Sequence, residues 1–386
     1  MSRPPFTFLE FFAGGGMARL GLGARWRCLF ANDFDAGKAE AYRANWGGDD
    51  FRLGDVWALG VGDVPGQPDL AWASSPCQDF SLAGARAGLA GGKSSAFWGF
   101  WRLIEALDDA ARAPRVLVLE NVGGLLSSHG GGDIAAVCEA LARRGYRFGA
   151  VEIDAKAFTP QSRPRVFIIA TRTWPTALVT SGPVGCHSRG VRQAFAGLPQ
   201  ALQRQWLWWA LPQPAARNTR LADLLEPDDQ VRWRSRAQTQ ALLDQLSPGH
   251  AEKWRNALAD GGRVVAAVFR RIRQQDGVKV QRAELRLDGL AGCLRTPGGG
   301  SSRQLLLVGL GGETRSRLVT AREGARLMGL PDDYRLLGSQ TAAMRVIGDG
   351  VAAPVVRFLA EHLLEPLLDA PPPVLGADKT LEVLSD

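Results

Sequence analysis

The first 170 residues alternate short apolar runs with helical patterns, and this alternation constrains the fold more than any other feature. The apolar runs that we interpret as buried strands are Phe6–Phe12, Arg27–Ala31, Asp69–Ala73, Arg115–Leu119 and Arg165–Ala170. The helical patterns between them cover Ala36–Trp46, Ser95–Arg112 and Asp133–Arg144. Such alternation predicts an α/β fold, with a doubly wound, mostly parallel sheet covered by helices on both faces.

The pattern changes after Trp174. Residues 175–235 are rich in Pro, Gln, Trp and Arg and show no clean periodicity. The later runs that we expect to form strands of a smaller mixed region are Val264–Phe269, Val278–Leu287 and Gln304–Val308. Helical patterns return at Thr320–Met328, Thr341–Ile347 and Val351–Leu364. We therefore predict a first domain at 1–174, a smaller one at 175–315, C-terminal helices at 316–368 whose last member packs back on the first domain, and a flexible tail at 369–386.

Composition excludes several classes of protein. An apolar content of 46% argues against global disorder, and no apolar run reaches the length of a membrane span. Five cysteines are too few for a secreted disulfide scaffold, and no signal-peptide core is visible, so we expect a cytoplasmic protein. Residues 172–315 hold 21 basic and 11 acidic residues, whereas the whole chain has a net charge of +7. This middle region can bind a polyanion, or it can simply be a solvated basic face.

Three strand ends carry residues typical of a nucleoside site. Phe11–Gly16 is a glycine-rich turn at the end of the first strand, although it lacks the spacing of a dinucleotide fingerprint. Asp33 follows the second strand, where an acid suits a ribose diol, and Asp55 follows the third. Together these residues favour an adenosine-bearing cofactor. The alternatives are a plain tight turn and two capping aspartates.

A second group of residues suggests covalent catalysis. Cys77 follows Pro76 after the fourth strand, and Glu120 ends the fifth. Arg163 and Arg165 precede a later strand. A thiol, a carboxylic acid and two guanidinium groups at one sheet edge suit nucleophilic catalysis, and the Gly/Ala/Ser-rich loop at 78–95 suits a lid. Taken singly, each has a structural alternative, such as a buried cysteine beside helix caps.

These segments resemble the DNA (cytosine-5)-methyltransferases, in order and spacing, over residues 6–365. The motifs that carry the resemblance are Phe12-Ala13-Gly14-x-Gly16, Ser75-Pro76-Cys77-Gln78, Glu120-Asn121-Val122, Gln161-x-Arg163-x-Arg165, 317–332 and Gly348-Asp349-Gly350-Val351. The resemblance implies a class I methyltransferase fold, S-adenosylmethionine as cofactor, double-stranded DNA as partner, and a target-recognition domain facing the catalytic domain. It implies no metal site.

The resemblance also implies roles for individual residues. Cys77 is the nucleophile, Glu120 and Arg165 contact the cytosine, and Arg163 supports the thiol or the base. The residues expected to bind the cofactor are Phe12, Ala13, Gly14, Gly16, Asp33, Phe34, Asp55, Val56, Pro76, Asp349 and Val351. The residues expected to bind DNA are Gln78, Ser81, Arg270, Arg271, Arg273, Arg282 and Arg303. The other cysteines are expected to be dispensable for the chemistry: Cys28, Cys138, Cys186 and Cys293.

Three positions depart from the family pattern. Ser75 stands where the family has proline, and Glu10 where it has aspartate. Asp349 replaces the usual asparagine near the methionine end of the cofactor. There its carboxylate would favour the cationic groups of the cofactor, or it would instead cap the helix that starts near Val351.

We therefore interpret the chain as a monomeric, sequence-specific DNA cytosine C5-methyltransferase of a restriction–modification or epigenetic system, with any cognate endonuclease acting separately. One alternative is tRNA as substrate, but the Cys-Phe-Thr element of that branch is missing. A catalytically silent DNA-binding homologue is disfavoured by intact Cys77, Glu120 and Arg165. A nicotinamide-dependent oxidoreductase is disfavoured by the glycine spacing.

Overall fold

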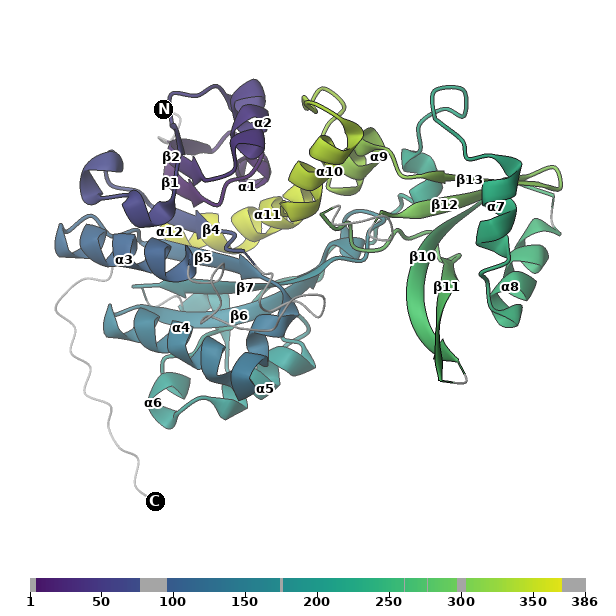
Figure 1. Ribbon diagram of the computed structural model, residues 1–386. Coiled ribbons are helices and arrows are strands. Elements are labelled where there is room, and N and C mark those ends of the chain that lie inside the picture. The colour runs from purple at the N-terminus through teal and green to yellow at the C-terminus, as the bar shows by residue number, and fades with distance from the viewer. Residues whose placement is uncertain are drawn as a thin grey trace, which may run out of the picture.

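A seven-stranded sheet is the centre of the first part of the chain (Figure 1). A computed structural model describes residues 5–76, 96–173, 176–259, 261–275, 277–296 and 303–369. In sheet order the strands are β3 (Phe51–Leu53), β2 (Trp26–Asp33), β1 (Phe6–Phe11), β4 (Leu70–Ala73), β5 (Val116–Asn121), β7 (Pro164–Thr171) and β6 (Arg147–Asp154). The strands from β3 to β5 run parallel, whereas β7 is antiparallel to both β5 and β6.

Both faces of this sheet are buried. In β5, Val116 and Val118 belong to one hydrophobic cluster, and Leu117 and Leu119 belong to another on the opposite face. The first face is covered by α1 (Met17–Leu22), α2 (Ala36–Trp46), α11 (Ala353–Leu359) and α12 (Glu365–Asp369). The second is covered by α3 (Ala96–Asp109) and α4 (Gly132–Arg143). The predicted doubly wound α/β fold is confirmed.

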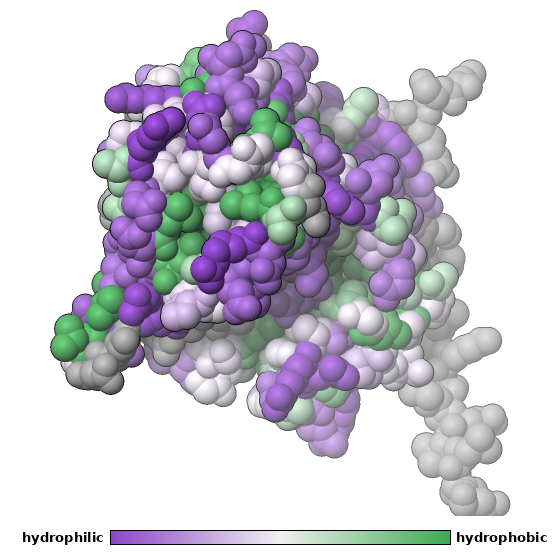
Figure 2. Space-filling model, turned by 90° about the vertical axis from the view of Figure 1, so that its right-hand side faces the viewer, coloured by the Kyte–Doolittle hydropathy of each residue, from purple (hydrophilic) through white to green (hydrophobic). Residues whose placement is uncertain are grey.

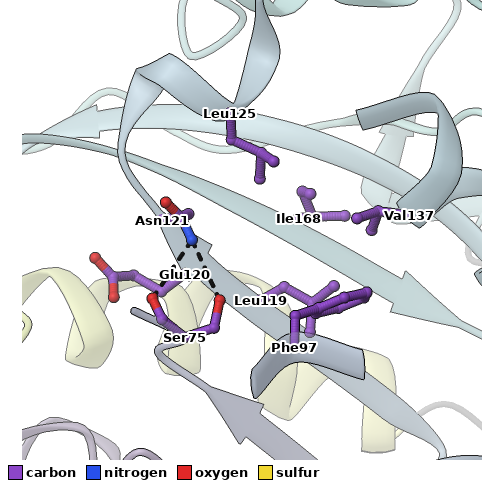
Figure 3. Close-up of a pocket in the computed structure, with 8 residues that line it drawn as sticks. All are labelled: Ser75, Phe97, Leu119, Glu120, Asn121, Leu125, Val137 and Ile168. Carbon is purple, nitrogen blue, oxygen red and sulfur yellow. Dashed lines mark hydrogen bonds between the residues drawn. The ribbon is translucent and has the colours of Figure 1, made fainter. Parts of the chain in front are cut away.

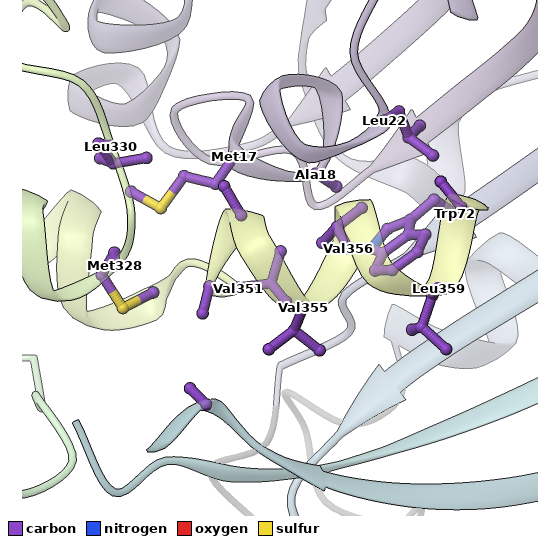
Figure 4. Close-up of a cluster of buried hydrophobic side chains, with 14 of the residues drawn as sticks. Met17, Ala18, Leu22, Trp72, Met328, Leu330, Val351, Val355, Val356 and Leu359 are labelled. Carbon is purple, nitrogen blue, oxygen red and sulfur yellow. The ribbon is translucent and has the colours of Figure 1, made fainter. Parts of the chain in front are cut away.

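The C-terminal helices close one face of the sheet. They are α9 (Ala321–Leu327), α10 (Gln340–Asp349), α11, a π-helical turn at Ala360–Leu364, and α12. Figure 4 shows Val355, Val356 and Leu359 of α11 between α1 and the sheet, near Trp72 of β4. A Cβ on Gly21 would lie 2.4 Å from the Cβ of Val356, so only glycine permits this approach of α1 to α11. Residues more than 330 positions apart thus share one core.

A separate antiparallel sheet carries the second part of the chain. Its strand order is β11 (Val278–Arg286), β10 (Val264–Gln275), β12 (Leu305–Leu310) and β13 (Glu313–Leu318). Two helices, α7 (Arg236–Leu243) and α8 (Pro248–Leu258), contribute Leu242 and Trp254 to the core of this part, and the turn between them contributes Leu246. Figure 2 views the molecule from this end and shows a mostly hydrophilic surface with scattered hydrophobic areas.

Residues 176–209 lie beside the first sheet. They form β8 (Val179–Thr180), α5 (Arg189–Gly197), α6 (Gln200–Gln203) and β9 (Trp208–Trp209). The backbone N–H of Leu207 donates to the carbonyl of Phe148 in β6, and the N–H of Glu152 donates to the carbonyl of Cys186. This packing covers the edge strand β6. The division of the chain at 174/175 stays a prediction.

Some sequence-based boundaries were wrong. Strand β6 was not predicted because Gly149 interrupts its apolar run, yet a Cβ there would lie 1.9 Å from the carbonyl oxygen of Leu207. The helices α5 and α6, which lie in the region without clean periodicity, were also missed, as were α7 and α8 after it. Ser235 and Gln238 form a capping box at the start of α7, and this signal was available in the sequence. In the described part of the chain, no helix has the length and apolarity to cross a membrane.

Candidate active site

The sheet topology brings the expected site residues to one edge. The strands β2, β1, β4 and β5 are parallel, so their carboxyl ends meet there. Because β7 is antiparallel to β5, its beginning reaches the same edge: Asn121 pairs with Val166 and Glu120 with Phe167. The topology therefore explains how Arg165 comes to lie beside Glu120, although 45 positions separate them.

The glycine turn after β1 has a backbone conformation that favours glycine. Phe12, Gly14 and Gly16 have φ angles of 57°, 56° and 77°. The N–H of Gly14 donates to the Asp33 carboxylate at 2.9 Å. The carbonyl of Gly15 accepts from Trp46 Nε1 at 3.0 Å and from the Tyr334 hydroxyl at 2.8 Å. Three hydrogen bonds thus hold the turn in place. No atom lies within 4 Å of the position that a Cβ on Gly14 would occupy.

The ends of β2 and β3 supply groups that fit a nucleoside. Asp33 is buried, and its carboxylate also accepts from the N–H of Asp35 at 2.9 Å. Phe34 beside it is 67% exposed, which is unusual for a phenyl ring. The Asp55 carboxylate accepts from the N–H of Trp57, and Val56 is buried. An exposed aromatic ring next to one carboxylate, with a second carboxylate after the neighbouring strand, fits an adenosine: the ring can stack on the base, and the carboxylates can accept its N–H and O–H groups.

Glu10 is a buried carboxyl group near the end of β1. It is 2% exposed, and burial raises its pKa to about 8 despite hydrogen bonds from the N–H groups of Arg19 and Ala18. Its Oε2 atom has no hydrogen-bond partner in the structure. This departure from the family's aspartate therefore places a carboxyl group that is neutral over most of the physiological range under the glycine turn.

Glu120 and Arg165 form a buried ion pair at the end of β5. Arg165 Nε lies 3.1 Å from Glu120 Oε1, and the two side chains are 13% and 8% exposed. Next to Glu120, the amide of Asn121 donates to the Ser75 hydroxyl oxygen at 3.2 Å (Figure 3). This bond fixes the turn Ser75–Pro76, which leads directly to Cys77. Cys77, Gln78, Ser81 and the expected lid at 78–95 lie outside the described residues.

A small pocket lies under this turn. It is lined by Ser75, Phe97, Leu119, Glu120, Asn121, Leu125, Val137 and Ile168. Figure 3 shows Phe97, Leu119, Val137 and Ile168 on one side, while the Glu120 carboxylate points away from them. These apolar residues belong to the core under α3 and α4, so the pocket lies between that core and the end of β5.

Arg163 joins three segments that are far apart in the sequence. Its guanidinium donates to the carbonyls of Leu294 at 2.9 Å, Gly348 at 2.9 Å and Gly350 at 2.6 Å. The side chain is 2% exposed. Support of the thiol or the base is an expectation that these contacts do not address. Through these contacts, Arg163 holds the 293–295 segment and the end of α10 against the start of β7.

Cys293 was expected to play no part, yet it lies beside both arginines. Its Sγ is 3.3 Å from Arg163 Nη1 and 4.0 Å from Arg165 Nη2. Burial opposes ionisation of this thiol, but the two arginines outweigh it and lower its pKa. No sequence signal indicated this position, because 128 residues separate Cys293 from Arg165.

Asp349 does not cap the following helix. It is the last residue of α10, and α11 begins at Ala353 without a side-chain cap. The Asp349 carboxylate lies 2.8 Å from Lys38 Nζ and also accepts from the Thr296 hydroxyl. Lys38 is near the start of α2, close to Asp33. The pair offsets much of the charge that Asp349 would otherwise present to a cofactor, and neither Lys38 nor Thr296 was predicted. Val351 is buried.

The predicted DNA-binding arginines lie on or near the β10–β11 hairpin. Arg271 and Arg273 both pair with Glu284 on β11. Arg270 and Arg282 lie on the same two strands, and Arg303 precedes β12. In the part of the chain that the structure describes, no three potential metal ligands lie together.

Comparisons with known proteins identify the family of the chain. The model of the family "C-5 cytosine-specific DNA methylase" matches residues 6–365. The Type II methyltransferase M.NlaX of Neisseria lactamica is 26% identical over 364 residues, which cover 93% of this chain and 96% of that protein. M.HhaI of Haemophilus parahaemolyticus is 24% identical over 365 residues, which cover 92% and 93% of the two chains.

Solved structures share the fold. The Entamoeba histolytica methyltransferase EhMeth aligns with a TM-score of 0.61 and 13% identity, covering 94% of this chain and 99% of that chain. The Dnmt2 methyltransferase of S. pombe aligns with a TM-score of 0.55 and 18% identity over the same shares. With the family model matched from β1 to the end of the C-terminal helices, the chain belongs to the C-5 cytosine-specific DNA methylases.

Proposed function

We propose that this DNA cytosine C5-methyltransferase acts on a cytosine in a specific sequence of duplex DNA, with S-adenosylmethionine as methyl donor and Cys77 as nucleophile. The observation that carries the proposal is the buried Glu120–Arg165 pair beside the turn that leads to Cys77. The glycine turn and Asp33 lie on the same sheet edge. A base-binding group and a nucleoside-binding group therefore adjoin one another.

The residues at the ends of β1 to β3 would hold the cofactor, which supplies an electrophilic methyl group on a sulfonium. Asp33 would accept from the ribose hydroxyls, and Asp55 from the adenine amine. The exposed ring of Phe34 would stack on the adenine. No atom covers the backbone at Gly14, so the rest of the cofactor could approach it closely.

Cys77 would make the cytosine reactive. C5 of cytosine is a poor nucleophile, so direct methylation is slow. Addition of the thiolate to C6 forms the S–C6 bond and moves the ring electrons towards C5, which can then take the methyl group. Loss of the C5 proton to a base or water and breakage of the S–C6 bond restore the aromatic ring and the thiolate.

Glu120 and Arg165 would hold the ring during this addition. Negative charge develops on N3 and O2 as the thiolate attacks. A proton shared between Glu120 and N3, and the guanidinium of Arg165 at O2, would offset that charge. Because the pair is almost fully buried, water screens these interactions only weakly.

The target cytosine must leave the duplex to reach this edge. A stacked base is inaccessible, so flipping it out costs a few kcal/mol, which DNA contacts must offset. The positive excess of residues 172–315 supplies such contacts, and we propose the part from α7 to β13 as the recognition region. We further propose that the enzyme acts as a monomer in a restriction–modification system, in line with its similarity to Type II methyltransferases.

The proposal is tested by product analysis. The full chain is incubated with S-adenosylmethionine labelled in the methyl group and with either genomic DNA or tRNA. Each nucleic acid is then digested to nucleosides. The proposal predicts labelled 5-methyldeoxycytidine from duplex DNA. Label on tRNA alone, or on another base, contradicts it.

A further inference from the structure

The β10–β11 hairpin carries a cluster of two arginines around one glutamate. Glu284 Oε2 lies 3.1 Å from Arg271 Nε, and Glu284 Oε1 accepts from Arg273 Nε at 2.9 Å. We call Arg271, Arg273 and Glu284 the hairpin fork. In Figure 1 this hairpin extends beyond β12 and β13, away from the rest of its sheet.

The register of the hairpin places the fork on one face. Phe269 pairs with Glu284, Arg271 with Arg282 and Arg273 with Val280. Directly paired residues and alternate residues share a face of a sheet, so Phe269, Arg271, Arg273 and Glu284 point the same way. The opposite face contributes Val268 and Ala283 to the core under α7 and α8.

The face with the fork is the one that continues towards the catalytic edge. Phe269 contacts Gly292, since a Cβ there would lie 2.1 Å from the phenyl ring. The next residue, Cys293, lies beside Arg163 and Arg165. Strand residues advance by about 3.3 Å each, so Arg271 and Arg273 lie about 7 and 13 Å along β10 from this contact. A duplex rises by about 3.4 Å per base pair, so a fork this close to the proposed site would meet base pairs near the target.

The fork matters little for folding but suits recognition. The side chains of Arg271 and Arg273 are 55% and 53% exposed, and exposed ion pairs contribute only about 0–1 kcal/mol to stability. Glu284 nevertheless limits the rotamers of both arginines and offsets their mutual repulsion. Arg273 donates to Glu284 through both Nε and Nη2, which engages that side of its guanidinium. Arg271 contacts Glu284 through Nε, so its Nη1–Nη2 edge can meet a base. That edge matches the O6 and N7 acceptors of guanine in the major groove.

We propose that the hairpin fork reads guanine near the target cytosine, with Glu284 as the residue that positions Arg271 and Arg273. The inference rests on the proposed function, because it names a feature of the same DNA substrate. It predicts that the methylated sequence contains a fixed G·C pair within a few positions of the methylated cytosine.

Two measurements test this on the full chain. The first sequences methylated genomic DNA after treatment with the wild type, Arg271→Ala, Arg273→Ala or Glu284→Gln. The second selects duplexes from a random pool by binding alone. Arg143→Ala and Glu139→Gln are matched controls, because this exposed ion pair lies on α4, outside the proposed recognition region.

We expect the wild type to require guanine at that position in both measurements. Arg271→Ala or Arg273→Ala should lower the preference for guanine about 10-fold or more, and Glu284→Gln should lower it while methylation of non-cognate DNA persists. The controls should keep the wild-type preference. The inference would be overturned if the DNA sequence that the wild type methylates had no fixed G·C pair in that window. It would also be overturned if the variants weakened binding to all DNA sequences equally. A wild type that selects guanine but never forms 5-methylcytosine supports this inference and refutes the proposed function.

Discussion

Replacement of Arg163 by alanine tests whether this arginine fastens the site together. Its guanidinium donates to three backbone carbonyls, those of Leu294, Gly348 and Gly350, at 2.6–2.9 Å. Hydrogen bonds to a charged group contribute about 1.5–3 kcal/mol each, and the three share one donor group, so they are not additive. We expect Arg163→Ala to lower the free energy of unfolding by about 3–5 kcal/mol.

The assay is urea unfolding followed by tryptophan fluorescence, with and without S-adenosylmethionine. Arg236→Ala is the matched control: its side chain is 99% exposed, and we expect a change within about 0.5 kcal/mol. Arg163→Lys should recover part of the loss, since an ammonium group can donate to some of the same carbonyls. If the free energy of unfolding of Arg163→Ala stays within about 1 kcal/mol of the wild-type value while activity is lost, the arginine acts on the reaction and does not hold these segments together.

Three further predictions concern Glu10, the Lys38–Asp349 pair and Cys293. Burial raises the pKa of the Glu10 carboxyl from its ordinary 4.5 to about 8 in the folded chain. The folded chain therefore keeps a proton that the unfolded chain loses, and stability falls as pH rises between these values. Glu10→Gln should remove this loss in urea unfolding at pH 6 and 8, and a constant difference from wild type at both pH values would contradict it. Lys38→Met and Asp349→Asn should each weaken cofactor binding in calorimetry, and the double variant should lose less than the sum, by about 1 kcal/mol; strict additivity would mean that the pair is not coupled. Cys293 should react with iodoacetamide at neutral pH before the buried Cys28, because arginines lower the pKa of Cys293 whereas burial raises that of Cys28 to about 12; equal labelling by mass spectrometry would contradict this.

The strand ends could be predicted from the sequence because the signals there are local. Helix α2 spans Ala36–Trp46 as expected, and Asp35 caps it by accepting from the N–H of Lys38. The strands β1, β4 and β5 are short apolar runs in the sequence, and most or all of their residues are buried. Once the strands are known to be parallel, their carboxyl ends meet at one edge.

The rest of the site depends on contacts between distant segments. Lys38 meets Asp349 across 311 positions, and Arg163 meets Gly350 across 187. No periodicity or spacing in one sequence predicts such pairs. The same holds for β6, whose glycine is required by the backbone of Leu207, which lies outside the sheet.

The most direct test of the mechanism is covalent trapping on a duplex that carries 5-fluorocytosine at the methylated position, with S-adenosylmethionine present. Fluorine cannot leave as a proton does, so the S–C6 bond persists after methyl transfer. We expect the wild type and Cys293→Ser to form a complex that survives denaturing electrophoresis, and Cys77→Ser to form none while still binding the duplex. A stable complex with Cys77→Ser, or loss of the complex in Cys293→Ser alone, would contradict the assignment of Cys77 as the nucleophile.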